Sequence, residues 1–311
     1  MNEFDVIRSI SERLVAPPPE VVVPIGDDCA VLRLGDALWV AATDMLVSGR
    51  HFRASWADPE DVGYKAVAVN VSDVAAMGAV PRFVLASGGA DDPETTLRCM
   101  EGVLEACEEF GAYPLGGDTT AAAALTVDVA ILGQLAHAPV LRTGAHPGHL
   151  LAVTGELGAS AAGLLALENG RADPARLVRK HLRPEPRVAL GRAAARLGAR
   201  AMIDLSDGLA SDVRHLCEKS GVGCRVDLDL LPVAGDTREY LSSVGRDPEI
   251  LAATGGEDYE LLIAAPEEVV ETLAAESEVP VTVVGQTTGE GVEFLRDGEP
   301  VGTLSGWDHF A

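Results

Sequence analysis

The chain has 311 residues, of which 47% are hydrophobic and only 4% aromatic, and its formal net charge is −24. At roughly 100–200 residues per domain, this length suggests two domains. The acidity argues against nucleic acid, which is bound through cationic side chains on its phosphates, and against anionic membranes.

The targeting signals that can be read from a sequence point to the cytoplasm. No apolar run approaches the roughly 20 residues that span a bilayer, and the charged first 13 residues lack the apolar region of a signal peptide. The cysteine count is odd and includes no C-x-x-C pair, so we expect reduced, mostly buried thiols and neither disulfides nor a zinc site. The five are Cys29, Cys99, Cys107, Cys217 and Cys224.

Only three of the 24 basic residues are lysines, namely Lys65, Lys180 and Lys219. An acidic, lysine-poor surface could reflect salt adaptation or merely base composition. Its field would repel an anionic substrate at long range. If the substrate carries phosphate, the active site therefore needs bound cations.

The first half of the chain alternates strand-like and helix-like segments. The apolar spacing in this half predicts strands at Leu38–Thr43, Arg82–Ser87 and Leu125–Leu135, and helices at Asp61–Gly78 and Glu94–Phe110. Gly111 closes the second helix.

A loop-like stretch then divides the chain. Residues 137–148 hold Pro139, Gly144, Pro147 and Gly148, so we predict domains at residues 1–137 and 138–311. The second half restarts with a strand, a glycine turn and a helix of small residues. We predict strands at Leu150–Thr154, Met202–Leu205, Cys224–Leu228, Glu260–Ala264, Val281–Gly285 and Val292–Arg296, and helices at Pro186–Leu197, Leu209–Lys219 and Pro266–Glu276. Asp297-Gly298 predicts a hairpin after the last strand, and the whole pattern predicts an α/β (α+β) fold in two domains.

Acidic residues occur at the ends of apolar strands or inside an apolar helix, flanked by glycine, in six short motifs. Each motif alone favours a structural role, because Gly-Asp pairs are ordinary turn chemistry and Asp118 or Asp207 could cap a helix. The motifs are Gly26-Asp27-Asp28, Thr43-Asp44, Asn70-Val71-Ser72-Asp73, Gly116-Gly117-Asp118-Thr119, Asp204-Leu205-Ser206-Asp207-Gly208 and Gly255-Gly256-Glu257-Asp258.

Six such motifs together indicate chemistry. Half-buried carboxylates repel one another and are costly to desolvate unless they are protonated or bind cations. Oxygen ligands without a His or Cys cluster suit Mg²⁺, and glycine neighbours let backbone N–H groups approach phosphates.

The common nucleotide motifs are missing from the sequence. No Gly-Lys dipeptide exists, so there is no Walker A loop, and neither His-Arg-Asp nor Asp-Phe-Gly of the protein kinases occurs. A nucleotide enzyme with this sequence must therefore hold phosphates mainly through metal ions.

In their order, the motifs resemble those of the thiamine-monophosphate kinases, in the superfamily that includes aminoimidazole ribonucleotide synthetase. The resemblance covers nearly the whole chain, and the ordered set is specific although any one tetrapeptide is weak. It rests on Ile25-Gly-Asp-Asp-Cys-Ala30, Gly49-x-His51-Phe52, Tyr64-Lys-Ala-x-Ala-Val-Asn-x-Ser-Asp73, Ala76-Met-Gly-Ala79, Gly116-Gly-Asp-Thr119, Arg142-Thr-Gly-Ala145, His181-Leu-Arg-Pro184, Ile203-Asp-x-Ser-Asp-Gly208, Gly255-Gly-Glu-Asp-Tyr-Glu-Leu261 and Trp307-Asp-His-Phe310.

The resemblance implies a two-domain aminoimidazole ribonucleotide synthetase-like fold whose N-terminal domains pair in a homodimer. It implies direct, in-line, Mg²⁺-assisted transfer of the ATP γ-phosphate to thiamine monophosphate, the last step of thiamine diphosphate biosynthesis. The acceptor phosphate is already ionised, so positioning and electrostatics suffice without a general base.

The resemblance also implies roles for individual residues. Several Mg²⁺ ions would be bound by Asp28, Thr43, Asp44, Asp73, Asp118, Asp204 and Asp207, and catalysis would depend most on Asp44, Asp118 and Asp207. ATP would contact Gly117, Asp118, Arg142 and Ser206, and thiamine monophosphate would contact His51, Glu257 and Trp307. Ala42 departs from some relatives, which carry a hydroxyl residue there, so a side-chain ligand is lost, although a backbone oxygen could substitute.

Sister families and a different class of protein remain as alternatives. A selenophosphate synthetase should carry a reactive Cys before Gly26, a hydrogenase-maturation relative should end in a Cys, and aminoimidazole ribonucleotide synthetase should lack the Trp-Asp-His-Phe ending. A non-catalytic acidic module that binds metal or nucleotide would differ by failing to turn nucleotide over.

Overall fold

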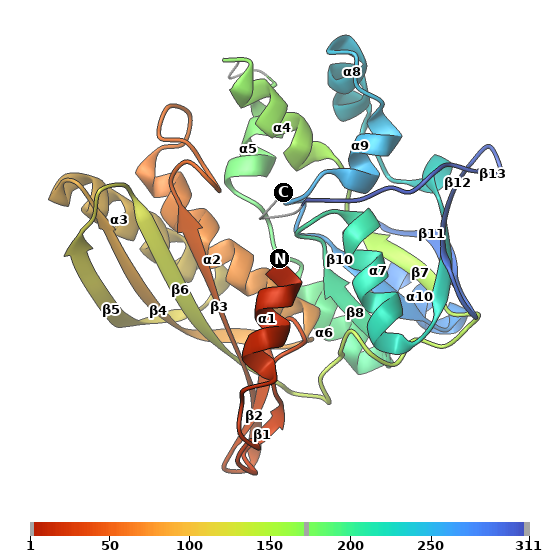
Figure 1. Cartoon of the computed structure of the whole chain (residues 1–311), viewed down its shortest axis with the longest axis horizontal. Coiled ribbons are helices and arrows are strands. Elements are labelled where there is room, and N and C mark those ends of the chain that lie inside the picture. Colours follow the sequence, from red (N-terminus) through yellow and green to blue (C-terminus); the bar gives the residue numbers. More distant parts are fainter. Residues whose placement is uncertain (1–2, 171–173, 308–311) are drawn as a thin grey trace.

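Two mixed β-sheets organise the chain, one in each half (Figure 1). The structure is a computed structural model and describes residues 3–170 and 174–307. The first sheet has the strand order β1-β2-β3-β6-β4-β5 and the second β13-β12-β9-β11-β7-β10-β8. Residues 135–149 connect the two sheets, and we place the domain boundary in this segment.

The first domain packs helices α2 and α3 on one face of its sheet (Figure 1). Strand β6 shows why, because its residues alternate between buried and half-buried and Val127, Val129 and Ile131 enter the core under the helices. The elements are α1 (Glu3–Ser11), β1 (Val21–Val23), β2 (Ala30–Leu34), β3 (Ala37–Val47), α2 (Pro59–Ala76), β4 (Val80–Ala90), α3 (Pro93–Phe110), β5 (Tyr113–Ala121) and β6 (Thr126–Gln134).

Helix α2 is buried along most of its length and joins the two domains. It contacts the first sheet and α3 on one side, and α6 and β8 of the second domain on the other. A helix enclosed in this way needs apolar residues all round. The few charged residues that it carries inward, such as Lys65 and Asp73, must therefore find partners across the domain interface.

The second domain surrounds its sheet with helices. Its elements are β7 (Leu150–Thr154), α4 (Ala159–Glu168), α5 (Ala175–Leu182), α6 (Val188–Leu197), β8 (Ala201–Asp204), α7 (Leu209–Ser220), β9 (Gly223–Asp227), η1 (Leu228–Leu230), α8 (Gly235–Ser243), α9 (Pro248–Thr254), β10 (Leu261–Ala265), α10 (Glu267–Glu276), β11 (Val281–Thr288), β12 (Val292–Arg296) and β13 (Glu299–Pro300). Its main core lies between the sheet, α7 and α9.

Each strand and helix predicted from the sequence has a counterpart, with ends that differ by a few residues, and the hairpin of β12 and β13 is confirmed. The β5 strand was not predicted. Because Asp118 lies within β5, it does not cap a helix. All five cysteines are buried free thiols, as predicted. None of the helices in the described residues is long and apolar enough to cross a membrane.

Candidate active site

Three carboxylates converge where the two domains meet. Asp28 precedes β2, Asp73 lies near the end of α2 and Asp204 ends β8. One oxygen of each lies within 4.8 Å of the others. Burial, reinforced by the neighbouring charges, raises the pKa of Asp204 to about 7 and the pKa of Asp73 well above its ordinary value. These groups therefore resist ionisation together unless a cation joins them.

Arg142 and Ser72 hold this carboxylate cluster in place. Arg142 Nη2 donates to Asp28 Oδ1 at 2.5 Å, and Ser72 Oγ donates to Asp204 Oδ2 at 2.6 Å. The backbone N–H of Arg142 also donates to Asp27, whose pKa burial raises to about 6. The single positive charge of Arg142 cannot neutralise several carboxylates. The cluster therefore has a net negative charge when its carboxyl groups are ionised.

The cluster fits a divalent cation with a preference for oxygen. Asp28 Oδ2 is buried and has no hydrogen-bond partner among the residues that the structure describes, which is costly unless something else binds it. Carboxylate oxygens from three elements are the donor set that Mg²⁺ uses. Asp44 on β3 lies near enough for its charge to raise the pKa of Asp73. Thr43, the residue before it, donates from Oγ1 to Asp128 Oδ1 at 3.1 Å, so its side chain points away from the cluster.

Three segments of the second domain meet beside the cluster. The backbone N–H of Glu257 donates to the Ser206 carbonyl at 2.8 Å, and that of Trp307 donates to the Asp207 carbonyl at 2.9 Å. A Cβ on Gly256 would lie 2.5 Å from the Ser206 carbonyl oxygen, so this close approach requires glycine. The predicted residues Ser206, Asp207, Glu257 and Trp307 are thereby brought to one place, whereas Asp308, His309 and Phe310 of the C-terminal motif lie outside the described residues.

The backbone at Glu257 is unusual. Glu257 has φ 67° and Tyr259 has φ 51°, a left-handed conformation that is uncommon for residues other than glycine. Such strain persists where surrounding contacts impose it, and it clusters at functional sites. Here the imposing contacts are the bonds of this segment to residues 205 and 206.

The side chain of Glu257 faces charged and polar groups from other elements. Lys65 Nζ lies 2.9 Å from Oε1, and His181 Nδ1 lies 3.4 Å from Oε2. Burial would raise the pKa of Glu257, but the charge of Lys65, with lesser influences of His181 and His51, outweighs burial and lowers the pKa below its ordinary value. His51 accepts the Val47 N–H at Nδ1, so its proton, when neutral, is on Nε2.

Gly117 and Asp118 lie in another part of the first sheet. Asp118 is in register with Ser87 of β4, Ser87 with Asp128 of β6, and Asp128 with Met45 of β3. Three strand spacings separate Asp118 from β3 by about 14 Å along the sheet. The structure therefore does not bring Asp118 to Asp44 within the chain.

Sequence reasoning gave no role to three buried residues at this site, Lys65, His181 and Asp212. Asp212 accepts the Gly208 N–H at 3.1 Å and so supports the start of α7. Lys65 could have been noticed, because it is one of only three lysines and stands in an apolar helix. His181 carried no local signal beyond its motif.

Both halves of the chain match known family models. Residues 26–135 match the AIR synthase related protein, N-terminal domain, and residues 146–298 match the corresponding C-terminal domain. Thiamine-monophosphate kinase of Mycobacterium tuberculosis H37Rv is 43% identical, over 82% of this chain and 78% of the relative. The enzyme of that name from Escherichia coli K12 is 40% identical, over 100% and 98%. The solved structure of AaThiL complexed with AMPPCP and TMP superimposes with a TM-score of 0.88 at 34% identity and covers 99% of this chain and 97% of that one.

Proposed function

The chain belongs to the thiamine-monophosphate kinase family, and on this premise we propose that it transfers the γ-phosphate of ATP to thiamine monophosphate, giving thiamine diphosphate and ADP. Its relatives carry that name, and AaThiL is described with AMPPCP, an ATP analogue, and TMP. The observation in this chain that best supports the reaction is the cluster of Asp28, Asp73 and Asp204. A reaction that consumes ATP suits the cytoplasm, which we propose as its location.

Different residues of the site are proposed to bind Mg²⁺, ATP and thiamine monophosphate, so that the two phosphorylated substrates can approach each other. Asp28, Asp44, Asp73 and Asp204 would hold Mg²⁺, with Asp207 and Asp118 as further ligands. Bound Mg²⁺ supplies positive charge that offsets the repulsion between the ATP and acceptor phosphates. No general base is needed, because the acceptor oxygen is already ionised.

Arg142 and Ser206 are proposed to contact ATP. Arg142 is fixed by Asp28, so its guanidinium is oriented before substrate arrives. His51, Glu257 and Trp307 are proposed to surround the thiamine moiety. A site ordered in advance in this way lowers the barrier through positioning.

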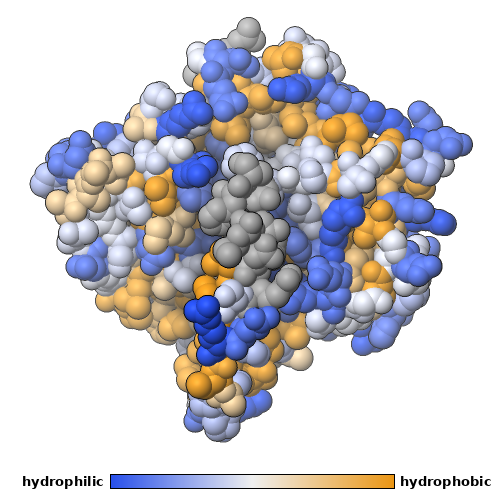
Figure 2. All heavy atoms as spheres, viewed as in Figure 1, coloured by the Kyte–Doolittle hydropathy of each residue, from blue (hydrophilic) through white to orange (hydrophobic). Residues whose placement is uncertain are grey.

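We propose that the active site is completed in a homodimer. The face of the first sheet opposite to α2 and α3 carries the exposed side chains Met45 and Leu85, together with the stacked rings of Trp39 and Phe83. Apolar residues lie among polar ones over the visible part of this sheet (Figure 2). Such a patch is typical of an interface.

The position of Asp118 supports the same arrangement. Asp118 is about 14 Å from β3 along its own sheet, so it would act on the cluster of a second protomer, across the paired sheets. Mixed dimers of Asp118→Asn and Asp204→Asn chains should then regain activity, because one of the two sites would hold neither substitution. Mixtures that stay as inactive as the parents would contradict the shared site.

The reaction itself is tested by ADP release with a panel of acceptors. Thiamine monophosphate with Mg-ATP should yield thiamine diphosphate, identified by chromatography, and free thiamine should not react. Turnover of formylglycinamidine ribonucleotide or selenide without turnover of thiamine monophosphate would assign the protein to a sister family.

A further inference from the structure

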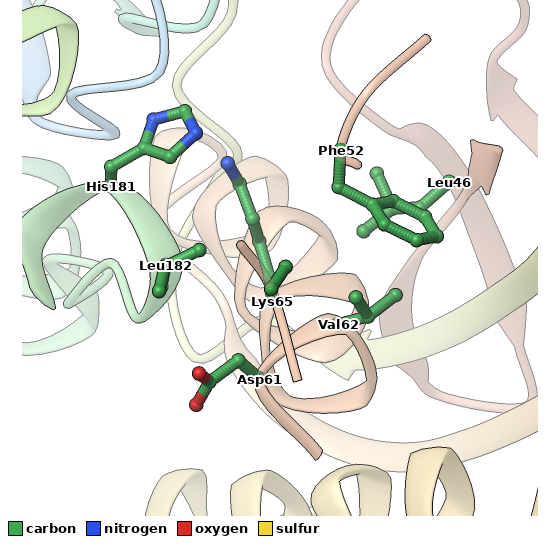
Figure 3. Close-up of a pocket in the computed structure, with 8 residues that line it drawn as sticks. Leu46, Phe52, Asp61, Val62, Lys65, His181 and Leu182 are labelled. Carbon is green, nitrogen blue, oxygen red and sulfur yellow. The ribbon is translucent and has the colours of Figure 1, made fainter. Parts of the chain in front are cut away.

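Lys65 is a buried cation, and the apolar side chains around it restrict the direction of its ammonium group. Its aliphatic chain lies among Leu46, Phe52, Val62 and Leu182, and Figure 3 shows its ammonium directed away from these side chains and toward His181. The space between them is a cavity of about 10 Å³, which holds at most one water. This cavity therefore offers the ammonium little water in place of a lost partner.

The partner of Lys65 is Glu257 of the other domain. Nζ lies 2.9 Å from Oε1 and makes no hydrogen bond of normal geometry within the described residues, so the ion pair is its main compensation. The Lys65 side chain is 5% exposed and that of Glu257 is 27% exposed, and a cation and an anion at this distance form a unit that is close to neutral. The pair also connects α2 to the strained segment at Glu257.

His181 contacts the second oxygen of the same carboxylate and, when its proton is on Nδ1, can donate to that oxygen without adding charge. Its Nδ1 lies 3.4 Å from Glu257 Oε2 and 3.1 Å from Ser160 Oγ. Burial and the charge of Lys65 lower the pKa of His181 to about 3, so the ring is neutral. An ionised carboxylate accepts about four hydrogen bonds, so Glu257 keeps acceptor capacity for a substrate.

We infer that Lys65 and His181 are positioning residues that hold Glu257 as a hydrogen-bond acceptor for the neutral aminopyrimidine amine of thiamine monophosphate, and not as the counter-ion of its thiazolium. The inference rests on the proposed function. A carboxylate already neutralised by Lys65 has little attraction left for a second cation. Its lone pairs are nonetheless fixed in direction by contacts from α2 and α5. The thiazolium must then be accommodated elsewhere, for example over the ring of Trp307.

The two possible roles of Glu257, hydrogen-bond acceptor and counter-ion, predict opposite results when Lys65 and Glu257 are both replaced by uncharged residues. Glu257→Gln alone should raise KM for thiamine monophosphate by about 10-fold or more, because it leaves the Lys65 ammonium buried and unpaired. The Lys65→Met, Glu257→Gln double variant removes both charges and keeps an acceptor oxygen. Its KM should return toward the wild-type value. A counter-ion role instead requires the double variant to be as impaired as Glu257→Gln.

The pH profile supplies a readout that a purely structural role would not move. Charged or titratable groups face Glu257 from α2 (Lys65), from α5 (His181) and from the loop after β3 (His51). Lys65→Met removes the largest influence that lowers the pKa of Glu257, so the acidic limb of kcat/KM for thiamine monophosphate should shift to higher pH. KM for ATP should change little, and Lys65→Arg should keep the wild-type profile.

Asp61→Asn is the matched control. Asp61 lies one turn before Lys65 on α2 and pairs with Arg183, just after α5, so it spans the same two elements without touching Glu257. It should leave the profile and both KM values near wild type. The proposed function would be overturned if the wild-type protein did not phosphorylate thiamine monophosphate. An active wild type with an unrescued double variant, or an unchanged Lys65→Met profile, would overturn this inference alone.

Discussion

Asp204→Asn should make the metal-free protein more stable at and above neutral pH, although Asp204 is buried at the centre of the acidic cluster. The carboxyl has an ordinary pKa of 3.8 and a pKa of about 7 in the folded protein. A raised pKa means that the folded state binds the proton more tightly. The stability that this proton contributes is present below about pH 4 and is lost as pH rises through about 7.

The size of the effect follows from the same two values. A rise from 3.8 to about 7 corresponds to about 4 kcal/mol at most. Asparagine does not titrate, so the stability of the variant relative to wild type should grow by up to that amount between about pH 4 and pH 8. Its side-chain oxygen can still accept the hydrogen bond from Ser72, which limits the local loss.

Urea unfolding followed by circular dichroism, in excess chelator and at several pH values, measures this difference. Added Mg²⁺ should stabilise wild type by about 2.7 kcal/mol at 100 times its Kd and should stabilise the variant much less. Asp247→Asn is a control of opposite sign, because Arg296 lowers the pKa of Asp247, so its loss should destabilise the protein near neutral pH. A variant of Asp204 less stable than wild type at pH 8, with an unchanged Mg²⁺ response, would refute the reasoning.

Activity should disappear in excess chelator and return with Mg²⁺ but poorly with Zn²⁺, and full activity without a divalent ion would contradict the carboxylate site. Asp44→Asn, Asp118→Asn and Asp207→Asn should each lower kcat/KM by roughly 100-fold or more while the protein still folds, and variants that unfold yet keep their specific activity would make these acids structural. Light scattering should give about twice the chain mass of 32.4 kDa, and a monomer at micromolar concentration would contradict the dimer. Trp307→Ala should raise KM for thiamine monophosphate much more than KM for ATP, because a desolvated cation over an indole gains about 2 kcal/mol, and equal effects on both would argue against it.

The sequence predicted those elements whose side chains repeat with a clear period. The alternation along β6 and the helical spacing of apolar residues in α2 are examples. Strand β5 was missed because Gly116-Gly117-Asp118-Thr119 has the composition of a turn. It is a strand because β4 pairs with it, and a Cβ on Gly117 would lie 1.6 Å from the Ala86 carbonyl oxygen. Helix α9 could have been predicted, since Asp247-Pro248 is an N-cap followed by proline at the first helical position.

The site was predictable as a set of residues but not as a geometry. The motifs named Asp28, Asp73 and Asp204, yet nothing in their spacing requires β8 to lie beside α2, because that contact depends on how the two domains pack. The same packing creates the pair of Lys65 and Glu257. A lone lysine in an apolar helix predicts a partner, but the partner's identity requires the tertiary structure.

The cations that the fold places beside the cluster also explain why the enzyme would need metal. Arg142 is paired with Asp28, and Lys65 with Glu257, so each is largely neutralised before a substrate arrives. In a chain of net charge −24, such paired groups orient a ligand more than they attract one. The attraction for phosphate must then come from ions that the acids themselves recruit. Carboxylates that are arranged to bind several cations repel one another until those cations bind. This repulsion accounts for the raised pKa values of Asp73 and Asp204. It is also consistent with Asp28 Oδ2, which has no hydrogen-bond partner among the described residues.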